Sequence, residues 1–245
     1  MSALLRLDRV SAAFGAVKVL DDLSLEVRAG EFVALVGPSG CGKTTLLNVC
    51  SGWLPPSSGV VHRPARLRMV FQQDGLFPWL TVDENIRLGL RHVTDAAERT
   101  RRADALLTLI GLTGFEQVYP HQLSGGMRQR VELARALGGE TPLLLMDEPF
   151  SSLDYLTRLK MRKELARILD EQPRTVMLVT HDIEEAAQLA DRVLVLSERP
   201  ARIRDEVVLA TPRPRDPTQP DVVRAVHRIL TELGVESPDS AEVHA

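Results

Sequence analysis

A glycine-rich segment carries the clearest chemistry in the sequence. It follows an apolar run at residues 32–36 and consists of Gly37, Pro38, Ser39, Gly40, Cys41, Gly42, Lys43, Thr44 and Thr45. Its spacing matches loops whose main-chain N–H groups surround phosphate oxygens, while the lysine reaches the terminal phosphates and a hydroxyl binds Mg²⁺. A turn that only joins a strand to a helix is the alternative, which the Lys43-Thr44 pair disfavours. The segment therefore predicts binding of a nucleoside triphosphate, ATP or a relative, together with Mg²⁺.

Two adjacent carboxylates follow another apolar run. Residues 143–146 favour a buried strand, and Asp147 and Glu148 come directly after it. Ligands of open α/β sheets bind at the carboxyl ends of the strands, where both side chains would lie. Asp147 fits a Mg²⁺ ligand acting through water, and Glu148 fits a base that polarises water at the γ-phosphate. Without the glycine-rich loop, the pair would be interpreted as a helix N-cap and its neighbour.

A second glycine-rich helix start lies at residues 123–130, Leu-Ser-Gly-Gly-Met-Arg-Gln-Arg. Ser124 is a good N-cap, and Gly125 and Gly126 would leave N–H groups available to another anion. Taken alone, the segment is equally consistent with an ordinary capped helix whose arginines are solvated.

The surrounding pattern indicates the elements that must position these residues. Residues 5–10 and 19–27 alternate as antiparallel strands do, whereas residues 80–137 indicate helices. Their helix signals are Thr81-x-x-Glu84, Asp95-x-x-Glu98 and the stripe Ala103, Leu106, Leu107 and Ile110 before Gly111. Short apolar strands at 143–146, 176–179 and 193–196 then alternate with helices at 156–169 and 183–189. This alternation predicts a parallel sheet covered on both faces.

The last third of the sequence ends in a separate pattern. Residues 211–220 form a Pro-rich linker with little propensity for regular structure. One helical stripe follows, made of Val222, Val226, Ile229, Leu230 and Leu233, and it favours packing on the body of the domain over a protein contact. We expect the tail from residue 236 to be frayed.

Composition narrows the classes of function. The chain has 245 residues with 30 basic and 33 acidic side chains, a net charge of −3, so nucleic acid is not expected as a partner. No apolar stretch approaches the ~20 residues of a membrane span, and the start lacks the features of a signal peptide. Cys41 and Cys50 lie only nine positions apart, which disfavours a disulfide and fits a reducing compartment.

Together, the segments at residues 37–45, 123–130 and 143–154 resemble the Walker A, signature, Walker B and D-loop segments of ATP-binding cassette (ABC) ATPases. The resemblance implies a P-loop NTPase (RecA-like) α/β core with an antiparallel β subdomain and an inserted helical subdomain. It places the ATPase domain at residues 1–210, its helical subdomain at about 80–137, the linker at 211–220 and a C-terminal helix and tail at 221–245. It also implies a head-to-tail homodimer, in which Ser124, Gly125 and Gly126 of one copy close the ATP site of the other.

Single residues take roles from the same resemblance. Gln72 follows Phe71 as the Q-loop glutamine, a Mg²⁺ and water ligand that senses a membrane subunit, and Gln73 is the weaker candidate. His181 resembles the switch histidine that contacts the γ-phosphate. Phe14 occupies the place of the aromatic residue that stacks on adenine, with a core position as the alternative. The sequence departs from the family pattern at Met127, where many members have glutamine.

The stretch at residues 75–85 and the segments at 197–200 and 213–215 resemble the nitrate, aliphatic sulfonate and taurine importers. We therefore expect the ATPase subunit of a bacterial importer, peripheral on the cytoplasmic face of the inner membrane, with permease subunits and, indirectly, a solute-binding protein as partners. Aromatic side chains at residues 75–85 suit a groove for a partner helix, unless Trp79 and Leu80 pack in the core. The alternatives are soluble ABC ATPases that assemble iron–sulfur clusters or act on DNA or ribosomes, and a P-loop kinase, which the signature segment and Glu148 disfavour.

Overall fold

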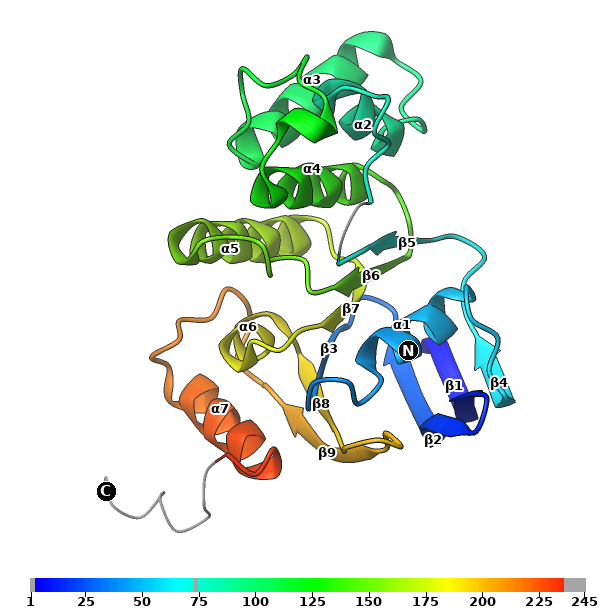
Figure 1. Cartoon of the computed structure of the whole chain (residues 1–245). Helices are drawn as coiled ribbons and strands as arrows, with labels where there is room; N and C mark the ends of the chain where they lie inside the picture. The colour runs from blue at the N-terminus through cyan, green and yellow to red at the C-terminus, as the bar shows by residue number, and fades with distance from the viewer. Residues whose placement is uncertain (1–2, 73–74, 236–245) are drawn as a thin grey trace. The chain divides into compact units, whose positions relative to one another are not determined.

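A computed structural model describes residues 3–72 and 75–235. The predictions for Gln73, the start of the chain and the tail from residue 236 fall outside these residues. The chain divides into two compact units, one formed by Met1–Ala65 with Ala166–Ala245 and the other by Arg66–Leu165 (Figure 1). Each unit is described by itself.

The first unit contains an antiparallel sheet in the order β2-β1-β4. Its strands are β1 (Ala3–Phe14), β2 (Val17–Arg28) and β4 (Ser58–His62). Gly15 has a φ of 57° at the tight β1–β2 connection, a left-handed conformation that glycine adopts without steric cost. Both long strands are confirmed and extend beyond their predicted limits, whereas the short β4 had no distinct sequence signal.

The same unit contains a parallel set of strands. Strand β3 (Phe32–Val36) pairs in parallel with β7 (Thr175–Val179) and β8 (Arg192–Leu196), and β9 (Ile203–Val208) pairs antiparallel with β8. Strands β3 and β7 are buried along their whole length, which explains their continuous apolar sequences. Helices α1 (Lys43–Ser51), α6 (Ile183–Leu189) and α7 (Pro220–Glu232) pack on these sheets.

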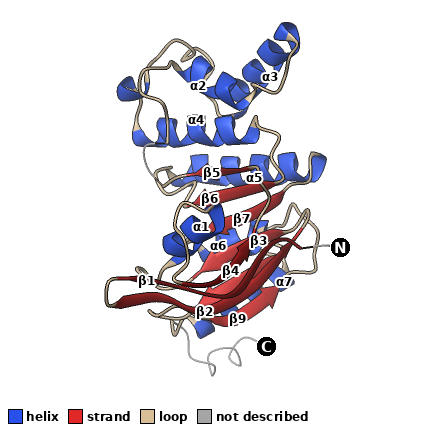
Figure 2. Cartoon of the chain, turned by 90° about the vertical axis from the view of Figure 1, so that its right-hand side faces the viewer, coloured by secondary structure: helices blue, strands red, loops and turns tan. Residues whose placement is uncertain are grey.

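The second unit combines two parallel strands with a group of helices (Figure 2). Its elements are β5 (Leu67–Val70), β6 (Leu143–Asp147), α2 (Val82–Gly89), α3 (Ala96–Leu109), the 3-10 turn η1 (Pro120–Gln122) and α4 (Gly125–Leu137). Helix α5 (Tyr155–Glu171) begins in this unit and ends in the other. Helices α2, α3 and α4 contact one another, and α4 also contacts β5.

Local sequence signals start and stop these helices. The Thr81–Glu84 capping box is confirmed in both of its hydrogen bonds at the start of α2. Asp95 caps α3 by accepting from the Glu98 N–H at 2.7 Å. Gly111 follows Ile110, the C-cap of α3, and has a φ of 63°, the left-handed conformation that ends many helices.

The Pro-rich linker contains neither helix nor strand up to Gln219, yet it is anchored. The buried guanidinium of Arg215 donates to the main-chain oxygens of Ala190 at 2.6 Å and Thr211 at 2.6 Å. Helix α7 buries Val222 and Ile229 of the predicted stripe and also Ala225. The linker thus places α7 against α6 and β9.

Both cysteines are free and buried. Burial raises the pKa of the Cys50 thiol to about 12, so this side chain stays neutral. Among the described residues, no helix has the length and apolar character needed to cross a membrane.

Candidate functional site

The glycine-rich loop occupies the carboxyl end of β3 and leads into α1. Gly40 and Gly42 have φ angles of 72° and 123°, conformations that side chains other than glycine rarely adopt. A Cβ atom at Gly42 would also lie only 2.8 Å from Cγ1 of Val19. The loop conformation therefore depends on glycine at these two positions.

Helix α1 starts without a side-chain cap and has no acidic residue in its first turn. By contrast, Thr81, Asp95, Ser124 and Asp182 each cap the helix that follows them. The first N–H groups of α1 are therefore left for another acceptor, and the helix dipole makes this position favourable for an anion. The loop fits a phosphate group in both shape and charge.

Lys43 folds back over the loop. Its Nζ donates to the main-chain oxygens of Gly37 at 2.8 Å and Pro38 at 2.9 Å, and the residue is buried. The side chain of Thr44, the next residue, is exposed. A cation and a hydroxyl thus lie together at the start of α1.

A residue without an assigned role also contacts the loop. Arg199, in the β8–β9 connection, donates from Nη2 to the Gly40 oxygen at 2.5 Å and from Nε to the same atom at 3.2 Å. Its segment entered the sequence interpretation only through a resemblance, because a contact 159 positions away leaves no local pattern.

His181 follows β7 at the same sheet edge as the loop. Leu35 in β3 is paired in register with Val179 in β7, so both strands end together. The turn that carries His181 is held by Thr180, whose hydroxyl donates to Glu185 at 2.9 Å and accepts from the Asp182 N–H at 3.0 Å. The histidine is exposed on this turn.

Phe14 is the last residue of β1 and is 53 % exposed. The alternative that it is an ordinary core residue is therefore wrong. An exposed ring at a turn is available for stacking against a planar group.

In the second unit, Gln72 and Glu148 lie together. Their strands end in register, with Val70 paired to Met146, and the Gln72 Nε2 donates to the Glu148 Oε2 at 3.1 Å. Asp147, the last residue of β6, is buried. An amide and a carboxylate thus meet at the carboxyl edge of this strand pair, and the buried Asp147 directly precedes Glu148 in the chain.

Glu148 has a left-handed backbone with a φ of 48°, which is uncommon for a residue other than glycine. Its main-chain oxygen accepts from the Nε2 of Gln129 at 2.8 Å and from the hydroxyl of Ser151 at 3.0 Å. Gln129 lies within the second glycine-rich segment, but the sequence alone assigned it no role. The one feature of the sequence that could have indicated a role is that Gln129 is a polar residue on the buried face of α4.

The second glycine-rich segment forms the start of α4. Ser124 caps the helix by accepting from the Met127 N–H at 3.2 Å. A Cβ atom at Gly126 would lie 2.9 Å from the Ser152 main-chain oxygen, whereas one at Gly125 would have no neighbour closer than 3.9 Å. The helix start therefore packs closely on the loop after Glu148.

The predicted residues fall into two groups. The first unit contains Phe14, residues 37–45 and His181, and the second contains Gln72, residues 124–126, Asp147 and Glu148. Within the described ranges, no cluster of three His, Cys, Asp or Glu residues suits a metal ion held by side chains alone. A metal that also binds phosphate oxygens needs fewer ligands from the protein.

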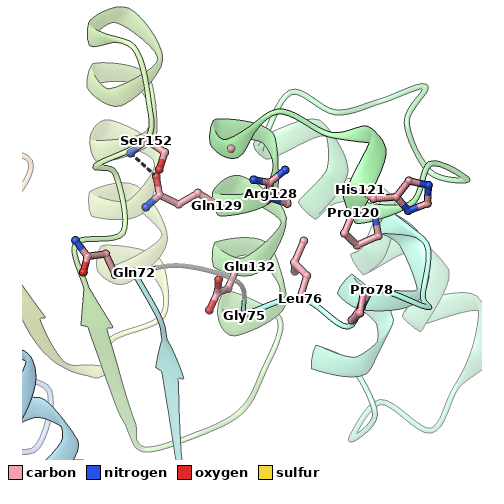
Figure 3. A pocket seen from close by; sticks show the side chains of 11 residues that line it. Gln72, Gly75, Leu76, Pro78, Pro120, His121, Arg128, Gln129, Glu132 and Ser152 are labelled. Atoms are coloured by element: carbon pink, nitrogen blue, oxygen red, sulfur yellow. Dashed lines mark hydrogen bonds between the residues drawn. The ribbon is translucent and has the colours of Figure 1, made fainter.

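A cavity of 590 Å³ opens beside α4 in the second unit (Figure 3). Its lining includes Leu76, Pro78, Pro120, His121 and Arg128. These side chains come from the loop before α2, from η1 and from α4, as Figure 3 shows.

Aromatic side chains are exposed in the same unit. Trp79 is 68 % exposed and lies 5.5 Å from Phe77, whose ring is covered by the guanidinium of Arg135. The alternative that Trp79 is buried in the core is therefore wrong.

Comparisons with known proteins identify the family of this chain. The model of the family described as ABC transporter matches residues 20–151. An uncharacterised ABC transporter ATP-binding protein of Methanocaldococcus jannaschii is 44% identical, over 89% of this chain and 85% of the relative. An aliphatic sulfonates import ATP-binding protein of Rhodococcus jostii is 47% identical, over 82% of each chain. A taurine import ATP-binding protein of a Jannaschia species is 44% identical, over 78% of this chain and 75% of the relative.

Solved structures of ATP-binding cassettes also match the chain. An ATP-binding cassette in a dimeric post-hydrolysis state bound to ADP and Pi matches with a TM-score of 0.76 at 32% identity, over 84% of this chain and 99% of that one. The predicted fold, a P-loop NTPase core with an antiparallel β subdomain and an inserted helical subdomain, is confirmed. The chain belongs to the ABC transporter family and is an ATP-binding ATPase subunit of that family.

Proposed function

We propose that the chain energises a bacterial membrane importer of a small sulfonate, taurine, nitrate or a related oxyanion. The observation that carries the proposal is the phosphate loop of the first unit, with its glycines in left-handed conformations. The Gln72–Glu148 pair at a strand end of the second unit supports ATP hydrolysis as the source of energy. The relatives that serve import of aliphatic sulfonates and of taurine support the choice of solute.

In the proposed site, residues 37–45 bind the phosphates through main-chain N–H groups and Lys43, and Phe14 stacks on adenine. Glu148 polarises the attacking water, and His181 contacts the γ-phosphate. Each of these residues lies at the end of a strand or in the segment that follows it, where its side chain can reach a ligand.

The residues proposed for Mg²⁺ are Thr44, Gln72 and Asp147. Each offers an oxygen atom, the type of ligand that Mg²⁺ prefers, and the exposed Thr44 follows the lysine of the phosphate loop. Bound Mg²⁺ would offset negative charge on the phosphates. The proposed Mg²⁺ site therefore rests on the oxygen atoms that these three side chains offer.

The proposed working form is a head-to-tail homodimer. Ser124, Gly125 and Gly126 of one copy would then face the ATP bound at the phosphate loop of the other. Exposure of Gly125 at the start of α4 supports this arrangement, as do the dimeric solved relatives. Residues 1–210 are proposed as the ATPase domain, followed by the linker and the C-terminal helix.

The proposed contact with the permease is the cavity beside α4 and the aromatic residues near it. A helix of a membrane subunit would insert apolar side chains against Leu76 and Pro78, and the exposed Trp79, which follows Pro78 in the chain, would add an aromatic contact. This contact would hold the chain on the cytoplasmic face of the membrane, and a solute-binding protein would act through the permease.

Reconstitution tests the proposal. The chain would be produced with the permease and binding protein encoded beside its gene and incorporated into liposomes. We expect ATP-dependent uptake of taurine, an alkanesulfonate or nitrate, and no uptake with the Lys43→Ala variant. Recovery in soluble fractions with iron–sulfur assembly factors, DNA or ribosomes would instead favour a non-transport ABC ATPase.

A further inference from the structure

Gln129 connects α4 to the loop that carries Glu148. Its Nε2 donates to the Glu148 main-chain oxygen at 2.8 Å and to the Ser151 hydroxyl at 3.2 Å, while its Oε1 accepts from the Ser152 N–H at 2.9 Å. Figure 3 shows the contact with Ser152. One side chain thus satisfies groups on both sides of the turn that follows β6.

This side chain is buried, with 5 % of its surface exposed. A buried amide that makes three hydrogen bonds is held in one orientation, because water does not compete for its partners. The loop that carries Glu148 is therefore hydrogen-bonded to a side chain of α4 that has a fixed orientation.

The backbone that Gln129 contacts is unusual. Glu148 has a φ of 48°, a conformation that persists only where its surroundings enforce it. The donor from Gln129 binds the carbonyl of this same residue, and Ser151 donates to that oxygen from its N–H and its hydroxyl. These contacts fix the direction in which the Glu148 side chain leaves the main chain.

We infer that Gln129 is a positioning residue for ATP hydrolysis, which holds Glu148 in its left-handed conformation and so aims its carboxylate. The inference rests on the proposed role of Glu148 as the base. The side-chain amide of Gln129 is engaged by groups of the loop that carries Glu148. Its effect on turnover passes through Glu148.

The test uses Gln129→Glu in the full-length chain, assayed with MgATP. This variant has the same shape and keeps an acceptor for the Ser152 N–H, but it replaces the donor to the Glu148 carbonyl by an oxygen. We expect kcat to fall at least tenfold, with the affinity for a fluorescent ATP analogue unchanged. Gln122→Glu is the matched control, because Gln122 is exposed and only accepts, from the Tyr119 N–H.

A second background separates positioning from a general loss of structure. In a chain carrying Glu148→Gln, the Gln129→Glu change should cause less than a twofold further loss, because both changes act on the same group. A thermal unfolding midpoint close to that of the parent would confirm that the variant folds. Gln129→Leu, which removes the donor without adding charge, serves if Gln129→Glu does not fold.

The outcomes distinguish the two proposals. Normal turnover in Glu148→Gln would overturn the role of Glu148 itself. A loss in Glu148→Gln with normal kcat in both Gln129 variants would overturn only the inference about Gln129. Equal fractional losses from the Gln129 change in both backgrounds would also overturn it, because they would indicate a purely structural residue.

Discussion

The Nζ of Lys43 lies 2.8 Å from the main-chain oxygen of Gly37, so the lysine side chain folds back onto the loop that precedes it. The same ammonium is the main side-chain countercharge proposed for the ATP phosphates.

Replacement of Lys43 by alanine should abolish measurable ATP binding. Hydrogen bonds to charged groups contribute about 1.5–3 kcal/mol each, and the terminal phosphates would lose more than one such contact. Isothermal titration with MgATP measures the effect. Lys160→Ala, at an exposed lysine of α5 outside both groups of site residues, is the control and should bind normally. Unchanged affinity in Lys43→Ala would refute the phosphate-loop assignment.

Replacement of Glu148 by glutamine should leave ATP binding intact and lower kcat by about 10²–10⁴, the usual contribution of a general base. Because hydrolysis then no longer opens the site, we expect a stable ATP-bound dimer in size-exclusion chromatography. The same variant with ADP should elute as the parent does. Unchanged turnover would remove Glu148 as the base.

Replacement of Arg199 by alanine should raise the KM for ATP several-fold with a smaller effect on kcat. The guanidinium holds the Gly40 carbonyl from the β8–β9 connection, and its loss frees the loop that must order around phosphate. Steady-state ATPase kinetics test this. Arg204→Ala, on β9 and paired with Glu232, is a control outside the loop. A change confined to kcat would contradict the prediction.

Replacement of Gly126 by alanine should destabilise the protein by about 1–3 kcal/mol, the range seen when an atom is forced into a packed site. The added Cβ meets a main-chain oxygen, that of Ser152, and main chain cannot swing aside as a long side chain can. Gly125→Ala is the matched control and should unfold at nearly the parent concentration of urea. Equal stability of the two variants would show that the loop after Glu148 yields freely.

The ion pair between Asp205 of β9 and Arg228 of α7 should stabilise the fold fully above about pH 4 and progressively less as the pH falls below that value. Its hydrogen bond with Arg228 holds the pKa of the Asp205 carboxyl below its usual range. A lowered pKa in the folded state means that the stabilisation is present above the unfolded-state pKa and disappears as pH falls through the folded-state pKa. The pair is partly exposed, so a double-mutant cycle with Asp205→Asn and Arg228→Met should give only about 0.5 kcal/mol at pH 7 and a smaller coupling at pH 2. A coupling energy that is the same at both pH values would contradict this assignment.

The parts of the fold that could be predicted are those with a local signal. The glycine spacing of the phosphate loop, the capping box at Thr81 and the buried run of β7 each depend on neighbouring residues alone. Strands β4, β5 and β9 are short or lie at an edge, where partial exposure weakens the apolar pattern. Their existence depends on partners far along the chain.

The same limit applies to the site. Residues of the loop and strand ends were found because their types and spacing match a chemistry. Gln129 and Arg199 were not, because each acts through a main-chain oxygen that the fold brings to it. Every residue has a main-chain carbonyl, so the sequence does not show which carbonyl a side chain will contact. Such contacts are found only in the three-dimensional structure.

Because both native thiols are buried, we expect thiol-specific labels to react little with the native chain. Neither Cys41 nor Cys50 is accessible to a bulky maleimide, and Cys50 also lacks the thiolate that such reagents need. A single cysteine placed at an exposed position, such as Trp53→Cys, should therefore carry one spin label per copy without removal of either native cysteine. Label-to-label distances with and without ATP would then report directly how two copies approach each other during turnover.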